Sequence, residues 1–219
     1  MAVAQLDPLG DFFIMRTFTT LLPTAVLGVL LQGCSTSPGA LPPDRTLSAA
    51  DARVNFSDPV LINRQILLFG SIDQQAAEHT IQKLLFLDRT QHAPIDLYLQ
   101  TPGGELKHAI AIEQIMRSLQ SRVNTYALSE CNSAGALLLA GGTGKRRVFQ
   151  GAVIVIHGMA AHGKPPPRYK ELIQDAYTHF WKTRCRLPDS WLPLPPGVLH
   201  VLSAEEALKY GVVDEVVAE

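Results

Sequence analysis

The stretch IDLYLQTPGGELKHAIAIEQIM, residues 95–116, decides the fold of this chain. Residues 95–99 follow a proline and have the β-rich composition of a buried strand. Gly103 and Gly104 then allow a sharp turn and leave backbone N–H groups free. Apolar residues recur at helical spacing from there to residue 116, so the stretch predicts a strand, a turn and a helix in succession.

The same succession recurs along the chain from about residue 46. Short β-rich runs predict strands, and segments with apolar residues at helical spacing predict helices between them. The predicted strands are residues 66–69, 95–99, 123–128, 147–149 and 153–156, and the predicted helices include 134–140 and 168–184. Crossovers of this length favour parallel strands with right-handed connections. We therefore expect residues 46–219 to form one α/β domain of repeated β-α-β units.

The bulk composition narrows the class of protein. The 219 residues are 47% hydrophobic and 18% charged, with a formal net charge of -1. Such a chain has enough apolar residues for one substantial core, and it lacks the basic excess that nucleic-acid binding needs. Cys34, Cys131 and Cys185 lack the paired spacing of a zinc site. We expect no metal, no cofactor and no nucleic-acid partner.

An apolar run, LLPTAVLGVLL, occupies residues 21–31. It is shorter than the roughly 20 residues that span a bilayer and has the length of a signal peptide. The sequence Leu-Gln-Gly-Cys follows at once and ends at Cys34. The next residues are rich in Ser, Thr, Pro and Gly, which predicts a flexible tether over residues 34–45. A buried core helix is the alternative interpretation of the apolar run.

This N-terminal arrangement resembles the lipobox of bacterial lipoproteins, although Gln32 replaces the small residue usual at that position. The resemblance implies a signal peptide over residues 1–33 and a lipid on Cys34. A lipid of two acyl chains would hold the protein on a membrane of the bacterial cell envelope, facing the periplasm or the exterior. Translation from Met15 would place Arg16 in the basic first part of such a signal, so Met15 is the alternative start.

Three junctions at strand ends carry residues suited to chemistry. The glycine turn at 101–104 offers free N–H groups to an oxyanion. Ser133 stands among small residues between a predicted strand and an apolar helix, and His157 directly follows the apolar strand 153–156, where a general base can be held rigidly. Each feature alone also has a simpler interpretation. The serine can be a helix N-cap, the histidine a residue of the core edge, and the glycines a tight turn or a phosphate cradle.

Together and in this order, the junctions resemble the Clp protease proteolytic subunit family, part of the wider crotonase-like superfamily. The matching stretches are residues 99–104, 132–142, 144–146, 155–157, 202–207 and 210–214. The resemblance implies a spiral of β-α-β units, with Ser133 as nucleophile and His157 as its base. It also implies an oxyanion hole formed by the N–H groups of Gly104 and Ala134, peptide or unfolded-protein substrates, and a homo-oligomer.

The family's triad acid has no counterpart at the matching position. Comparison without gaps places Pro195 there, in the proline-rich segment 192–197, which cannot form a regular helix. We expect Asp189, the nearest upstream carboxylate, to serve as the acid, with Asp214 and then Asp175 as alternatives. Without an acid, the histidine loses support for its tautomer and its charged form, and the precedent is a loss of about 10⁴ in turnover.

These features predict a serine-type endopeptidase that acts through an acyl-enzyme while tethered to a membrane. Export would separate it from the ATP-driven unfoldases of the cytoplasm, so we expect it to act without one on small or unfolded substrates. The missing acid motivates an alternative, an inactive peptide-binding or scaffold lipoprotein. Two further alternatives are an acyl-CoA enzyme of the crotonase type and a serine–lysine peptidase that uses Lys107 or Lys145 as its base.

Overall fold

The computed structural model describes residues 54–159 and 165–218 of the chain. The predicted signal peptide, residues 1–33, and the predicted tether, residues 34–45 with Cys34, lie outside the described residues. Among the residues that are described, no helix has both the length and the apolar character needed to cross a bilayer.

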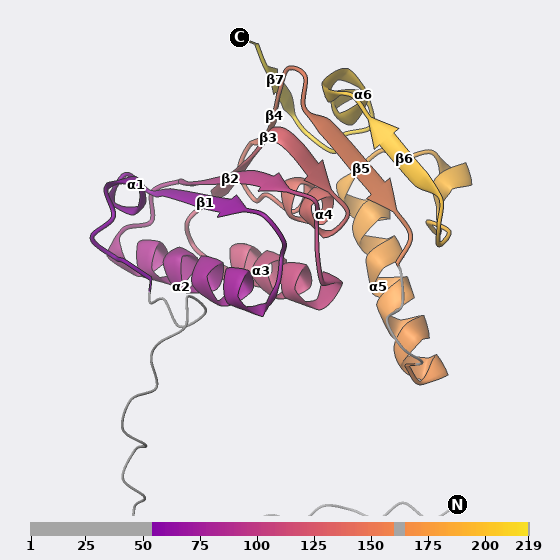
Figure 1. Cartoon of the computed structure of the whole chain (residues 1–219), viewed down its shortest axis with the longest axis horizontal. Coiled ribbons are helices and arrows are strands. Elements are labelled where there is room, and N and C mark those ends of the chain that lie inside the picture. Colours follow the sequence, from indigo (N-terminus) through magenta and orange to yellow (C-terminus); the bar gives the residue numbers. More distant parts are fainter. Residues whose placement is uncertain (1–53, 160–164, 219) are drawn as a thin grey trace, which may run out of the picture. The chain divides into compact units, whose positions relative to one another are not determined.

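Strands and helices alternate along the described chain (Figure 1). The strands are β1 (Gln65–Phe69), β2 (Ile95–Thr101), β3 (Val123–Asn132), β4 (Arg146–Phe149), β5 (Val153–His157), β6 (Leu199–Leu202) and β7 (Glu215–Val217). The helices are α1 (Pro59–Ile62), α2 (Gln74–Thr90), α3 (Leu106–Ser118), α4 (Ala134–Ala140), α5 (Pro167–Arg184) and α6 (Ala204–Lys209), and the 3-10 turn η2 (Asp189–Trp191) precedes β6. The predicted α/β fold is confirmed.

The sheet branches at β3, its longest strand. β1, β2, β3, β4 and β7 lie side by side in this order and pair in parallel. Residues 125–127 of β3 pair with β4, whereas residues 130–132 pair in parallel with β5. The end of β3 and the end of β5 therefore lie next to each other, which brings the residues that follow these strands together.

β6 departs from the predicted pattern because it pairs with β5 in the antiparallel direction. The prediction of parallel strands is confirmed for the pairings among the other strands. Neither β6 nor β7 was among the predicted strands. β6 spans only residues 199–202, and β7 only residues 215–217, so both give a weak sequence signal.

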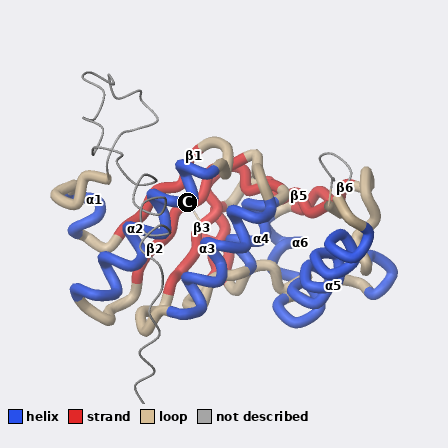
Figure 2. The backbone as a smooth tube through the Cα atoms, turned by 90° about the horizontal axis from the view of Figure 1, so that it is seen from below, coloured by secondary structure: helices blue, strands red, loops and turns tan. Residues whose placement is uncertain are grey.

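Helices α2, α3 and α4 cover one face of the strands β1 to β3 (Figures 1 and 2). Leu84, Ile112 and Leu138, one from each helix, are fully buried in the core that they form with the sheet. α4 consists only of Ala, Gly and Leu, and all of its residues are buried. A helix that is apolar all round belongs in the core, and burial of each leucine contributes about 1.5–3 kcal/mol. Ser133, which precedes α4, is therefore anchored at the edge of the core.

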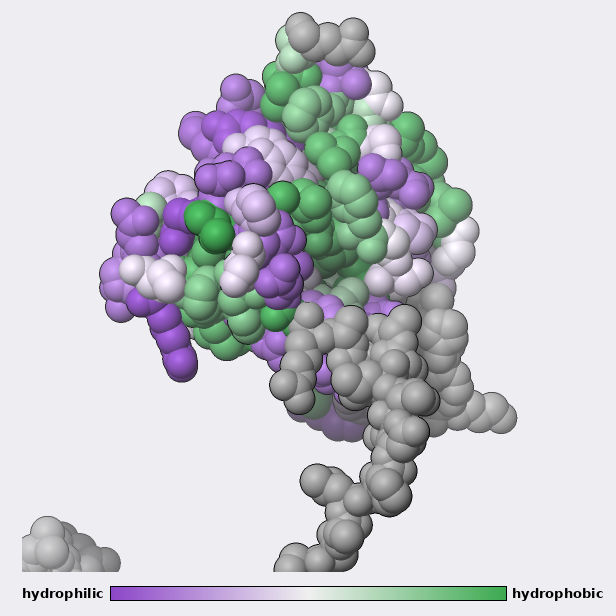
Figure 3. All heavy atoms as spheres, turned by 60° about the vertical axis from the view of Figure 1, so that its left-hand side comes forward, coloured by the Kyte–Doolittle hydropathy of each residue, from purple (hydrophilic) through white to green (hydrophobic). Residues whose placement is uncertain are grey.

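Part of the apolar surface remains exposed on the strands. Leu67 and Phe69 of β1 are 46% and 54% exposed, and Leu199 and Val201 of β6 are 61% and 59% exposed. Figure 3, which brings the β1 side of the molecule forward, shows apolar groups next to polar ones on that face. Exposed apolar side chains on neighbouring strand positions are typical of surfaces that contact another protein.

A partly buried ion pair joins Arg146 of β4 to Asp214, the residue before β7. The backbone N–H and the Nε–H of Arg146 donate to Oδ2 of Asp214, at 2.9 and 3.1 Å. Arg146 also donates to the carbonyl oxygens of Arg184 and Gly211, at 3.1 and 2.9 Å. Partial burial raises the pKa of Asp214, but the hydrogen bonds from Arg146 outweigh it and hold the pKa below its usual value. Asp214 is therefore a structural carboxylate.

We expect Asp214→Asn to lower the free energy of unfolding by about 1–2 kcal/mol at neutral pH, since a charge-assisted pair is lost. Because the folded-state pKa is depressed, the stabilisation is fully present above the ordinary carboxyl pKa of about 4 and is lost as the pH falls through the folded-state value. Urea unfolding curves over a pH series measure both effects. A wild-type advantage that does not shrink on acidification would contradict this account.

Candidate active site

Ser133 has a strained backbone between β3 and α4. Its φ is 55° and its ψ is -119°, a conformation that costs a residue with a side chain about 1–3 kcal/mol and that occurs mainly at functional sites. Its backbone N–H donates to the carbonyl of Val155 at 2.7 Å, which holds the strained residue in place. The side chain makes no capping hydrogen bond to α4. The hydroxyl thus stays available, although the residue occupies the N-cap position.

The glycine turn after β2 packs directly against this serine. A Cβ added to Gly103, whose φ is 101°, would lie 2.7 Å from the carbonyl oxygen of Asn132 and 2.8 Å from the Cβ of Ser133. Only glycine fits there, because any side chain would collide with the serine junction. The close approach brings the next residue, Gly104, to the same cavity as Ser133.

Two backbone N–H groups next to Ser133 are available to a ligand. Ala134 is the first residue of α4, where a helix leaves its N–H groups without internal partners. At the glycine turn, Ile72 bonds with the carbonyl of Gly103 and with the N–H of Glu105, and the N–H of Gly104 between them makes no backbone hydrogen bond within the described chain. The structure therefore brings both predicted oxyanion donors, Gly104 and Ala134, to one cavity with Ser133.

His157 ends β5, and its ring orientation follows from one hydrogen bond. Its Nδ1 lies 2.6 Å from the carbonyl oxygen of Gly158. A carbonyl can only accept, so Nδ1 carries a proton and donates it, and in the neutral imidazole the free lone pair is then on Nε2. That tautomer is the one a general base needs. His157 lines the same cavity as Ser133.

The proline-rich segment lies against Gly158. A Cβ added to Gly158 would lie 2.5 Å from both the carbonyl carbon and the carbonyl oxygen of Pro195 and would collide with the carbonyl of Leu194. Pro195, the residue at the family's acid position, is thus next to the residue that orients His157. In place of a carboxylate, the backbone carbonyl of Gly158 contacts the ring.

Among the described residues, none of the three candidate acids forms a hydrogen bond or an ion pair with the His157 ring. Asp189 opens η2 with an exposed side chain, and Asp175 is exposed on α5. Asp214 is held by Arg146. Within residues 54–159 and 165–218, no carboxylate forms an ion pair or hydrogen bond with the His157 ring. The assignment of Asp189 stays a prediction.

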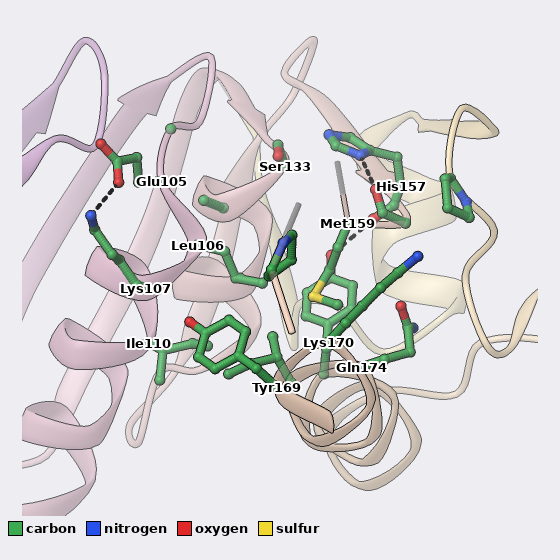
Figure 4. A pocket seen from close by; sticks show the side chains of 17 residues that line it. Glu105, Leu106, Lys107, Ile110, Ser133, His157, Met159, Tyr169, Lys170 and Gln174 are labelled. Atoms are coloured by element: carbon green, nitrogen blue, oxygen red, sulfur yellow. Dashed lines mark hydrogen bonds and ion pairs between the residues drawn. The ribbon is translucent and has the colours of Figure 1, made fainter. Parts of the chain in front are cut away.

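The cavity that contains these groups has a volume of about 430 Å³. Ser133 and His157 lie along one side of it, α3 contributes Ile110, and α5 contributes Tyr169 on the opposite side (Figure 4). Its walls are mainly apolar, which is typical of a ligand-binding pocket. The cavity therefore combines a hydroxyl, a free imidazole nitrogen and two N–H donors, the groups that acyl transfer requires.

Tyr177 of α5 is hydrogen-bonded to the backbone of the histidine. Its hydroxyl donates to the backbone carbonyl of His157 at 2.9 Å. Burial raises the pKa of Tyr177 to about 12, so the hydroxyl stays a neutral donor at physiological pH. Tyr177 is one of the buried residues of α5, and no sequence signal indicated this contact.

The two lysines of the serine–lysine alternative lie in different places. Lys107 lines the cavity, but its ammonium pairs with Glu105 at 2.7 Å, to the side of Ser133 in Figure 4. Lys145 is not among the residues that line the cavity, and its backbone N–H bonds with Asn124 at the opposite end of β3. Cys131 is also no competitor for Ser133, because it is fully buried and burial raises the pKa of its thiol.

Comparison with known proteins assigns the family. A family model described as Clp protease matches residues 49–168. The chain is 31% identical over 167 residues to the ATP-dependent Clp protease proteolytic subunit of Deinococcus radiodurans, covering 72% of this chain and 82% of the relative. It is 32% identical over 186 residues to the protein of the same name from Streptococcus salivarius, covering 78% and 93%. The chain belongs to the Clp protease family, and its kind of function is that of a protease.

We expect Asp189→Asn to change the rate at which a fluorophosphonate labels the protein by less than twofold. The reason is that the side chain of Asp189 is exposed and makes no hydrogen bond or ion pair with the described residues. The rate is measured from fluorescent bands on a gel over time. A slowing that approaches the roughly 10⁴ seen when a triad loses its acid would instead establish Asp189 as the acid.

Proposed function

We propose that this chain is a serine endopeptidase that hydrolyses peptide bonds through an acyl-enzyme on Ser133. The observation that carries the proposal is the placement of Ser133 and His157 on one cavity, with the Nδ1 proton of His157 donated to Gly158 and Nε2 free. Membership of the Clp protease family supports the same activity.

In the proposed reaction, His157 Nε2 takes the proton of the Ser133 hydroxyl as the oxygen attacks the carbonyl carbon of the substrate. The N–H groups of Gly104 and Ala134 stabilise the resulting oxyanion, and each such donor is worth about 2.7–4 kcal/mol in other serine proteases. His157 then gives the proton to the leaving amine. Water then loses a proton to His157 as it attacks the acyl carbon, and His157 returns that proton to the Ser133 oxygen as the bond to the acyl group breaks.

The carbonyl of Gly158 takes over one of the two roles of a triad acid in this proposal. It fixes the tautomer and orientation of His157 through the bond at 2.6 Å. It carries only a partial charge, so it stabilises the imidazolium less than a carboxylate does. The enzyme is therefore expected to be slow relative to a full triad.

A homo-oligomer forms part of the proposal. Exposed apolar side chains on the strands, such as Leu67 and Phe69 of β1, would be covered by a second copy of the chain. Light scattering of the purified full chain measures the mass of the assembly directly, and a monomer at all concentrations would refute this part.

We further propose that the protein is held on a membrane of the bacterial cell envelope by a lipid on Cys34 and acts there on peptides or unfolded proteins without an ATP-driven unfoldase. The support is the lipobox-like sequence that ends at Cys34. Cys34→Ser is expected to move the protein from the membrane fraction to the soluble fraction after cell lysis, and to abolish incorporation of a labelled fatty acid. Equal membrane association of both forms would exclude the anchor.

The activity is tested with a fluorophosphonate probe and a fluorogenic peptide. The wild type is expected to be labelled and to cleave the peptide, and Ser133→Ala is expected to lose both, with a decrease in turnover of at least about 10³. Ser118→Ala serves as the control, because Ser118 is an exposed serine at the end of α3. If a folded wild-type protein is neither labelled nor active at any pH from 6 to 9, the peptide-binding alternative replaces the enzyme.

A further inference from the structure

We propose that Lys170 gives this site a preference for peptides that carry an acidic side chain close to the cleaved bond. This inference deepens the proposed function and rests on it. It makes Lys170 a residue that determines specificity, with a carboxylate of the substrate as its ligand.

The balance of charge in the cavity favours an anion. Four side chains among those that line it are charged or readily become so: Glu105, Lys107, His157 and Lys170. Glu105 carries the single carboxylate of this lining set, and Lys107 neutralises it at 2.7 Å. His157 contacts the carbonyl of Gly158 through Nδ1 and acts as the base in the proposed reaction. Lys170 is therefore the cation whose charge the lining residues do not balance.

Lys170 also lacks a carboxylate partner elsewhere in the described chain. It forms no ion pair within residues 54–159 and 165–218. Its neighbour Glu171 is the nearest carboxylate along α5, but Glu171 pairs with Arg168 at 2.9 Å. An ammonium group with no partner beside a substrate pocket is available to pair with a carboxylate that the substrate supplies.

The side chain of Lys170 is free to follow a bound peptide. In Figure 4 it extends from α5 past Met159, on the side of the cavity away from Tyr169, and the residue is exposed. Because solvent screens an exposed charge, we expect its pairing with a carboxylate to contribute modestly to affinity. The flexible stem of lysine lets the charge follow substrates of different length.

The test compares peptides that differ in a single charge. Each peptide is amidated at its C-terminus and has Glu or Gln at one of the three positions before the cleaved bond, so the two members of a pair have nearly the same shape. Dissociation constants are measured by fluorescence anisotropy with the full chain carrying Ser133→Ala, which does not consume the peptide. Values of kcat/KM are measured with the chain that keeps Ser133.

At one position at least, the Glu peptide is expected to bind about fivefold more tightly than the Gln peptide, the upper end for an exposed ion pair. The same ratio is expected in kcat/KM. Lys170→Met should bring the ratio to one. Lys170→Glu should make the Glu peptide bind more weakly than the Gln peptide, and a peptide with Lys at the same position should then bind most tightly. Lys182→Met is the matched control, because Lys182 is exposed on the same helix but does not line the cavity, and it should keep the wild-type ratio.

A further experiment distinguishes a side-chain carboxylate of the peptide from its C-terminal carboxylate. A Gln peptide with a free C-terminus would gain in affinity over its amide only if Lys170 reads the terminal carboxylate, and that result would overturn the preference for an acidic side chain. A ratio of one at all three positions, or a ratio that survives Lys170→Met, would also overturn it.

Failure of the inference is distinguishable from failure of the proposed function. Cleavage of Glu and Gln peptides at equal rates leaves the endopeptidase intact and removes the role of Lys170. A charge preference in binding, together with no cleavage and no fluorophosphonate labelling, keeps the role of Lys170 and removes the endopeptidase. Absence of binding at millimolar peptide, with both partners soluble, overturns the inference.

Discussion

The hydrogen bond from the backbone N–H of Ser133 to the carbonyl of Val155, at 2.7 Å, is the constraint on which the site depends. It continues the pairing of β3 with β5 by one residue beyond the ladder that ends at Asn132. It holds Ser133 at a positive φ, and it ties the serine to the strand that carries His157 two residues further on. Serine and histidine therefore reach one cavity because two parallel strands end together.

The other parts of the site are held by close packing against this junction. Gly103 touches Ser133 so closely that no side chain fits, and Gly158 is equally tight against Pro195. Such contacts leave little freedom to the backbone groups that face the cavity. The N–H of Gly104 and the carbonyl of Gly158 are thus positioned by the same close packing that excludes side chains.

The lack of a carboxylate contact to the histidine among the described residues has a local physical consequence in the proposed mechanism. Comparison without gaps places the proline-rich segment at the position of the family's acid, and a backbone carbonyl lies 2.6 Å from Nδ1 of the histidine. A carbonyl is sufficient to select the tautomer but supplies no full negative charge to the imidazolium. The site is consistent with a protease in which positioning is retained and electrostatic support of the base is reduced.

The sequence by itself determined the alternation of strands and helices and the residues at strand ends, because hydrophobic periodicity and glycine placement are local properties. It predicted α4 at the residues where it occurs, 134–140, and it singled out Gly104, Ser133, Ala134 and His157, which the fold brings to one cavity. The antiparallel β6 was not predicted, since its four residues pair with a distant strand.

Only the tertiary structure decided which groups surround His157. Asp189 is close to the proline segment in sequence but lies exposed in η2, whereas Tyr177 and Lys170 reach the site from α5, whose local pattern carries no mark of it. Hydrogen bonds and charge balance depend on distances in space between residues far apart in the chain. Periodicity does not encode those distances, which arise only when helix α5 and the proline-rich segment pack against the end of β5.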